Sequence, residues 1–129
     1  MKFHTIPEAI QDISNGKMII VVDNEDRENE GDIVMASELI TPDAVNFMAT
    51  EARGLICVSI SEKRAKDLYL EQMNRRNTSL HETAFTVSVD AKNNTTTGIS
   101  AFDRAETIRV LISENSSPED LAKPGHIFP

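Results

Sequence analysis

Six acidic residues lie within ten consecutive positions, and Arg27 is the only basic residue among them. The six are Asp23, Glu25, Asp26, Glu28, Glu30 and Asp32. Two carboxylates about 4 Å apart repel by roughly 1 kcal/mol in bulk water and by about fourfold more near a protein surface. A divalent cation turns that repulsion into attraction. Because the segment offers oxygen ligands and no nearby Cys or His, it suits Mg²⁺, Mn²⁺ or Ca²⁺ better than Zn²⁺.

The position of this segment favours a binding site over a merely solvated loop. It directly follows the apolar run at residues 18–22, which has the length and composition of a buried strand. Open α/β sheets bind ligands just outside the carboxyl ends of their strands. In an extended segment, the side chains at positions 26, 28, 30 and 32 would share one side, whereas a helix would bring like charges four residues apart. An EF-hand does not match, because Gly31 falls at the wrong offset. A solvated acidic loop remains the alternative, since charge runs are usually exposed.

Composition predicts one domain spanning residues 1–129, because 40% of the 129 residues are hydrophobic and 26% are charged. The net charge of -8 disfavours nucleic-acid and anionic-membrane partners. No apolar run approaches the roughly 20 residues of a membrane span. The single cysteine, Cys57, excludes an internal disulfide, fits a cytoplasmic location, and is expected to pack as a small apolar residue.

Local patterns predict helices that alternate with strands. Thr5 and Glu8 form a capping box, Thr41-Pro42 begins a second helix, and Ser100 with Asp103 caps another. The expected elements are helices at 5–16, 41–54, 61–70 and from 100, a helical turn from 118, strands at 18–22, 33–36, 55–60 and 85–89, and a surface loop at 71–83. These elements indicate an α/β (α+β) fold, a single domain in which a mixed β-sheet is flanked by helices.

Three motifs in this order carry a family resemblance. They are Asp-Arg-Glu-Asn-Glu-Gly-Asp at 26–32, Thr-Gly-Ile-Ser-Ala-Phe-Asp-Arg at 97–104 and Pro-Gly-His-Ile-Phe-Pro at 124–129. Together they closely resemble 3,4-dihydroxy-2-butanone 4-phosphate synthase of riboflavin biosynthesis. The likeness covers the whole chain but only the earlier part of the family's domain, whose later Arg-x-Gly-His-Thr-Glu segment and further glutamate are absent here. We therefore expect the domain to continue past Pro129, and some family members also carry a GTP cyclohydrolase II-like domain.

The resemblance implies a lyase dependent on Mg²⁺ (or Mn²⁺) that converts D-ribulose 5-phosphate to L-3,4-dihydroxy-2-butanone 4-phosphate and formate. It also implies a homodimer with sites near the interface. By motif position, Glu28 and Glu30 would bind metal, and Arg27, Glu28, Asp32 and Thr97 would contact the sugar phosphate. His126 and Asp32 would be catalytic. Enolising a ketose requires a base for the carbon-bound proton and positive charge near its oxygens, which an imidazole and a carboxylate-held cation can supply.

Blander alternatives exist for the same residues. Taken alone, His126 would more often be a structural residue near a turn, and Thr97 would belong to a turn followed by a helix cap. A non-catalytic fragment that binds metal or sugar phosphate is the alternative function, and a plain acidic scaffold is a third. Because the later motif is absent, we expect these 129 residues alone to have weak activity or none.

Overall fold

The first two helices begin where their sequences provide caps. The computed structural model describes residues 3–81 and 83–129. Helix α1 (Ile6–Ser14) has Thr5 as its N-cap, and Glu8 completes the predicted capping box. Helix α2 (Pro42–Phe47) begins after Thr41, whose hydroxyl accepts a hydrogen bond from the Ala44 amide at 3.1 Å. It follows the short 3-10 helix η1 (Ser37–Leu39) and continues into a wider π-helical segment, η2 (Met48–Ala52), so the predicted second helix is confirmed with a distorted end.

The acidic loop joins two strands, as predicted, and the structure shows that these strands form an antiparallel hairpin. Strand β1 (Ile19–Val22) pairs with β2 (Gly31–Val34), with Val22 opposite Gly31 next to the loop. The expectation of a buried strand is wrong, because Ile20 is 73% exposed and its neighbours along β1 are also open to solvent. Helix α1 packs against β1 and η2 packs against β2. Even so, Ile20, Val21 and Val22 keep much of their apolar surface exposed.

The core forms around helix α4 (Ala101–Ile112), which packs against α2 and against a second antiparallel pair, β3 (Val89–Ala91) with β4 (Leu121–Ile127). Ser100 caps α4, as predicted, and Pro118–Asp120 forms the expected short turn, η3. Buried Thr107 links the helix to β3, because its hydroxyl accepts from the Ala91 amide at 2.9 Å. The fully buried side chains include Val45, Leu68, Val89, Leu111 and Ile127.

Arg64, from the short helix α3 (Glu62–Asp67), fastens that helix to the end of α4. Its guanidinium donates to the carbonyl oxygens of Leu111 at 2.9 Å and Ser113 at 2.5 Å. These carbonyls belong to the last turn of α4, where no amide of the helix is available to them. A cation there also interacts favourably with the helix dipole.

Three predicted strand or turn regions differ from the structure. Residues 55–60 form no named strand and pair at one position only, through a parallel bridge between Cys57 and Phe128, just after β4. In the predicted strand 85–89 only Val89 belongs to a named strand. Thr86 is buried and forms an isolated bridge with Gln72. His126, for which a place near a turn was considered, lies within β4.

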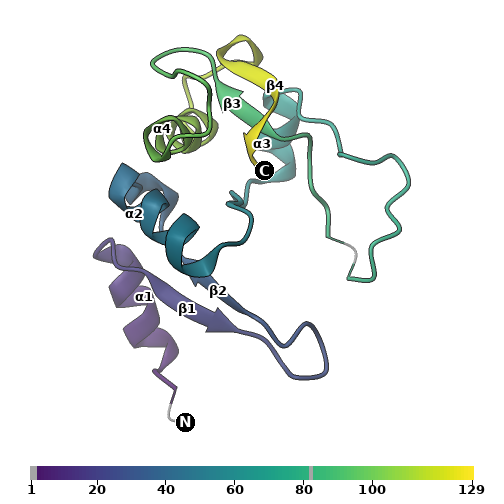
Figure 1. Ribbon diagram of the computed structural model, residues 1–129. Coiled ribbons are helices and arrows are strands. Elements are labelled where there is room, and N and C mark those ends of the chain that lie inside the picture. Colours follow the sequence, from purple (N-terminus) through teal and green to yellow (C-terminus); the bar gives the residue numbers. More distant parts are fainter. Residues whose placement is uncertain (1–2, 82) are drawn as a thin grey trace.

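The elements follow one another across the molecule in a simple order (Figure 1). Helix α1 and the β1–β2 hairpin lie at one end, α2 lies in the middle, and α4 with the β3–β4 pair lies at the other end. The α+β class is confirmed, with the strands in two small antiparallel sheets instead of one mixed sheet. The predicted loop at 71–83 extends to one side, and residue 82 in it is outside the described residues.

Candidate functional site

The acidic loop is a compact turn organised around the carboxylate of Asp23. That carboxylate accepts hydrogen bonds from the backbone amides of Glu28 at 3.0 Å and Glu30 at 2.9 Å, and from the Arg27 guanidinium at 2.9 Å. The amides of Glu28 and Glu30 hold the pKa of Asp23 below its ordinary value, and Arg27 lowers it further. Asn29 adopts a left-handed φ of 53°, which asparagine tolerates better than most residues.

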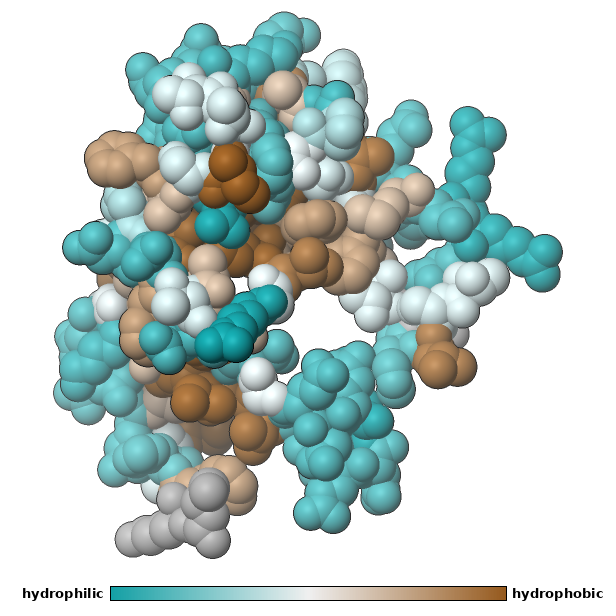
Figure 2. Space-filling model, viewed as in Figure 1, coloured by the Kyte–Doolittle hydropathy of each residue, from teal (hydrophilic) through white to brown (hydrophobic). Residues whose placement is uncertain are grey.

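Because the loop is a turn, its side chains do not alternate as they would in an extended strand. Arg27 Nη1 lies 3.1 Å from Glu28 Oε2, so two neighbours expected on opposite sides contact each other. The guanidinium therefore bridges Asp23 and Glu28 and offsets part of the repulsion within the acidic cluster. Figure 2 shows the hydrophilic surface of this turn, with a hollow between it and the loop at 71–85.

The candidate metal ligands differ in their surroundings. Glu28 is half-buried, whereas Glu30 and Asp32 are exposed. Within residues 3–81 and 83–129, no three His, Cys, Asp or Glu side chains gather closely enough to form a complete metal cage. Mg²⁺ does not need such a cage, since it keeps several waters and takes one or two protein carboxylates together with substrate oxygens. The carboxylates of Glu28 and Glu30 fit that partial donor set.

Asp32 lies close to Cys57. The Cys57 side chain is exposed, so its predicted packing is wrong, and the buried positions are those of its neighbours Ile56 and Val58. Nearby protein atoms still remove enough water to raise the pKa of the Cys57 thiol, and the negative charge of Asp32 raises it further. The backbone bridge from Cys57 to Phe128 connects this region with the end of β4.

The turn before α4 places Thr97 at the surface beside a buried carboxylate. Asp103 is 4% exposed and accepts from the Thr96 hydroxyl at 2.8 Å and the Gly98 amide at 2.9 Å. The Thr96 hydroxyl, followed by the Gly98 amide, holds the pKa of Asp103 below its usual range. The hydroxyl of Thr95 is also used internally, since it donates to the Ala91 carbonyl at 2.6 Å. Among the three threonines, exposed Thr97 is therefore the one left for a ligand.

His126 forms a pair with Asp90. Its ring nitrogen Nδ1 lies 2.8 Å from Asp90 Oδ2, and its backbone amide donates to Oδ1 of the same carboxylate, also at 2.8 Å. The side chain of His126 is 40% exposed, whereas that of Asp90 is 13% exposed. One edge of the imidazole is therefore fixed by the protein while part of the ring reaches solvent.

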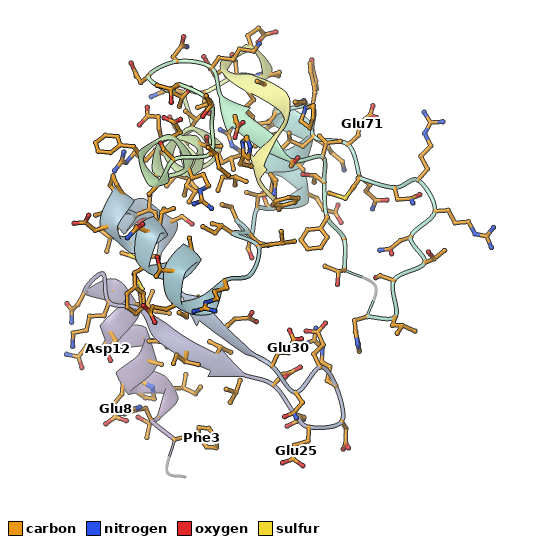
Figure 3. The ribbon with its side chains drawn as sticks, viewed as in Figure 1. Phe3, Glu8, Asp12, Glu25, Glu30 and Glu71 are labelled. Atoms are coloured by element: carbon orange, nitrogen blue, oxygen red, sulfur yellow. The ribbon has the colours of Figure 1, made fainter. Side chains whose placement is uncertain are left out.

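The structure brings the predicted residues together in separate groups. Arg27, Glu28 and Glu30 share the acidic turn, and His126 lies on β4 near the other end of the molecule. Figure 3 shows Glu30 well away from the strand that carries His126. Asp32 lies on β2 close to Cys57. The backbone bridge from Cys57 to Phe128 connects this region with the end of β4, the strand that carries His126.

Sequence reasoning missed the three carboxylates that organise these groups. Asp23 was counted only as a charge. An aspartate at the start of a turn often accepts hydrogen bonds from nearby backbone amides, and this signal could have been read from the sequence. Asp103 was identified as a helix-capping residue and not as the acceptor for Thr96 and Gly98. Asp90 has no local signal, because its partner His126 lies 36 residues away in sequence.

Comparison with protein families gives one match over nearly the whole chain. The family model described as 3,4-dihydroxy-2-butanone 4-phosphate synthase matches residues 7–129. The 3,4-dihydroxy-2-butanone 4-phosphate synthase of Agrobacterium fabrum is 57% identical, over 100% of this chain and 61% of that protein. The riboflavin biosynthesis protein RibBA of Aquifex aeolicus is 56% identical, over 99% of this chain and 32% of that protein.

The fold is also similar to solved structures. One, a 3,4-dihydroxy-2-butanone 4-phosphate synthase in complex with two magnesium ions, superposes with a TM-score of 0.95 at 43% identity. That match covers 98% of this chain and 59% of the other chain. This chain thus spans less than two thirds of each of these relatives.

Proposed function

The chain belongs to the 3,4-dihydroxy-2-butanone 4-phosphate synthase family, and on this premise we propose that the natural polypeptide containing it converts D-ribulose 5-phosphate to L-3,4-dihydroxy-2-butanone 4-phosphate and formate. The observation that carries the proposal is the organised acidic turn, in which one carboxylate orders the backbone while Glu28 and Glu30 keep theirs at the surface or half-buried. Such an arrangement suits a hard cation and a polyhydroxylated substrate.

Each predicted site residue has a distinct task in this proposal. Arg27 contacts the sugar phosphate through its guanidinium, which suits phosphate and hydroxyl oxygens. Asp32 accepts hydrogen bonds from substrate hydroxyls, and Thr97 donates its hydroxyl to a substrate oxygen. His126 moves the carbon-bound proton, because an imidazole can take and release a proton near neutral pH.

Glu28 and Glu30 would hold Mg²⁺ or Mn²⁺, whose positive charge would stabilise the negative charge that accumulates on the ketose oxygens during enolisation. Within the acidic turn, Arg27 then has a second effect. Its contacts with Asp23 and Glu28 fix the orientation of the Glu28 carboxylate before any ligand binds. A prearranged carboxylate loses less conformational entropy when it binds a cation.

The test is formate release from ribulose 5-phosphate by the natural polypeptide with Mg²⁺. EDTA should abolish release and added Mg²⁺ should restore it. Glu28→Gln should remove activity, whereas Glu25→Gln, a charge-matched change in the same turn, should leave most of it. Full turnover in Glu28→Gln would refute the metal assignment, and no formate from the unmodified protein would refute the proposed function.

A second candidate is a non-catalytic unit that binds Mg²⁺ or sugar phosphate. It is favoured by one specific observation, the separation of the acidic turn from the strand that carries His126. This candidate predicts that Mg²⁺ raises the melting temperature, because a ligand that binds only the folded state stabilises it, without any formate release. Neither a rise in melting temperature nor formate would favour a plain acidic scaffold.

We further propose a homodimer in the cytoplasm. The exposed apolar surface of the β1–β2 hairpin, including Ile20 and Val22, is consistent with a covered face in a larger assembly. None of the helices in the described parts of the chain is long and apolar enough to cross a membrane. Sedimentation analysis of the natural polypeptide tests the dimer directly.

A further inference from the structure

The carboxylate of Asp23 uses both of its oxygens inside the acidic turn. Oδ1 accepts a hydrogen bond from the Glu30 amide at 2.9 Å. Oδ2 accepts from the Glu28 amide at 3.0 Å and from the Arg27 guanidinium at 2.9 Å. The Asp23 side chain is 21% exposed, less than that of Arg27 or Glu28. Asp23 is therefore directed into the turn, where donors of the protein take the place of water.

The two amides that Asp23 binds lie on either side of Asn29. Asn29 has a left-handed φ of 53°, a conformation that costs energy for residues with a side chain, although asparagine tolerates it better than most. Hydrogen bonds on both sides of this residue hold it in that conformation. The backbone closes the same loop, because the Asp23 amide donates to the Glu30 carbonyl at 3.4 Å. Asp23 thus fixes the path of the chain from Glu28 to Glu30.

The path of this chain segment determines where the two candidate metal ligands begin. The direction in which a side chain leaves the backbone follows from the local backbone conformation. Arg27 adds a constraint on one of them, since Nη1 contacts both Asp23 Oδ2 at 2.9 Å and Glu28 Oε2 at 3.1 Å. Without Asp23 the turn would populate other conformations, and a cation would bind only the fraction of molecules in the competent one, which weakens the apparent affinity.

Asp23 is less suited to bind a cation itself than the other carboxylates of the turn. To coordinate one, its oxygens would have to exchange hydrogen bonds from two backbone amides and a guanidinium. Backbone amides that lose an acceptor leave a donor unsatisfied unless water replaces it. The exposed carboxylate of Glu30 requires no such exchange.

We propose that Asp23 is a positioning residue for the metal site and not a metal ligand: by binding the Glu28 and Glu30 amides, it keeps both carboxylates arranged for Mg²⁺ or Mn²⁺. This inference deepens the proposed function and rests on its assignment of Glu28 and Glu30. Asp23 touches neither the cation nor the substrate. It acts by lowering the conformational entropy that the turn loses when a cation binds.

The experiment measures Mn²⁺ binding to the natural polypeptide without substrate, by electron paramagnetic resonance of the free ion. It compares the wild type with Asp23→Asn and Asp26→Asn, and circular dichroism shows whether each variant is folded. Both changes remove one negative charge from the turn, but the Asp26 side chain is exposed, so Asp26→Asn controls for charge alone. An asparagine at position 23 has one acceptor oxygen, so one of the two amides loses its partner. Formate release at increasing Mg²⁺ concentrations gives kcat and the Mg²⁺ requirement.

The proposal predicts that Asp23→Asn binds Mn²⁺ about tenfold or more weakly than Asp26→Asn does, which is the effect of losing one hydrogen bond to a charged group. The Mg²⁺ concentration for half-maximal formate release should rise by a similar factor. At saturating Mg²⁺, kcat should return close to that of the wild type, because the bound cation selects the competent turn. A general disturbance of the fold would instead lower kcat at every Mg²⁺ concentration. If Asp23→Asn does not fold, Asp23→Ser, which also offers one acceptor oxygen, decides by the same measurements.

Equal Mn²⁺ affinities of Asp23→Asn and Asp26→Asn would overturn the proposal, as would a kcat that stays low at saturating Mg²⁺. Hydrogen exchange of the wild type tests the role of Asp23 separately. If Asp23 were a ligand, Mg²⁺ would draw its carboxylate away and speed exchange at the Glu28 and Glu30 amides, whereas we expect their protection to be kept or increased.

The outcome for the proposed function can be told apart from the outcome for Asp23. Wild-type protein that binds Mn²⁺ but releases no formate would refute the proposed function, and the Mn²⁺ affinities of the variants would still decide whether Asp23 positions the turn. Wild-type protein that releases formate but binds no Mn²⁺ without substrate would overturn the positioning role and leave the proposed function in place.

Discussion

Gly98→Ala should destabilise the protein strongly, because it strains the backbone and displaces Asp90 at the same time. Gly98 has a φ of 88°, and an alanine in the left-handed region costs about 1–2 kcal/mol. The new Cβ would also overlap the Asp90 carboxylate, which is only 13% exposed and makes two hydrogen bonds to His126. Losing one hydrogen bond to a charged group costs about 1.5–3 kcal/mol. The sum is a loss of about 2.5–5 kcal/mol.

Urea denaturation followed by circular dichroism measures this loss as a change in the free energy of unfolding. Gly54→Ala is the control, because nothing lies within 4 Å of a Cβ built there. We expect that change to alter stability by less than about 1 kcal/mol. Equal effects at Gly98 and Gly54 would show that Asp90 is not held against the turn before α4.

Three further predictions concern single contacts. Arg64→Met should lower the free energy of unfolding by about 2 kcal/mol, because Arg64 binds carbonyls at the end of α4. Lys63→Met, which removes an exposed ion pair, should lower it by less than about 0.5 kcal/mol. Equal losses of the two variants in urea denaturation would contradict this prediction. The pKa of Asp103 is lower in the folded protein than its value of about 3.9 in the unfolded chain. Its ionised carboxylate therefore stabilises the fold above that unfolded pKa, and this stabilisation is lost as the pH falls through the lower folded pKa. Stability measured against pH should therefore fall less steeply below about pH 4 in Asp103→Asn than in wild type, and identical slopes would refute the assignment. Asp23→Asn should speed hydrogen exchange at the backbone amides of Glu28 and Glu30, since the asparagine side chain has one acceptor oxygen where the carboxylate has two. Unchanged protection of these amides would mean that other contacts order the turn.

The sequence predicted the helices better than the strands for a physical reason. The caps formed by Thr5, Thr41 and Ser100 are contacts between residues three positions apart, so the local sequence contains all the information they need. Strand pairing depends on distant partners. The segment at 55–60 has strand-like composition but pairs at only one position, whereas β4 is a strand although it contains a proline and a glycine, which are uncommon within strands.

The same distinction applies to the candidate site. The acidic turn was located correctly because its residues are consecutive, but the side-chain arrangement was not, since it depends on the hydrogen bonds that Asp23 accepts. The contact between Asp90 and His126 could not be predicted, because the bulge that brings them together exists only once β3 and β4 have paired. The roles assigned to Thr97 and His126 remain predictions.

The position of the acidic turn at the end of the β1–β2 hairpin has a consequence for aggregation. Each strand of this two-stranded sheet has one free edge in the described structure, and β1 consists of four branched apolar residues, Ile19–Val22. Short strands of this composition are prone to pair with strands of other molecules. The carboxylates that follow β1 act as electrostatic gatekeepers, because two hairpins approaching edge to edge would bring their negative charges together.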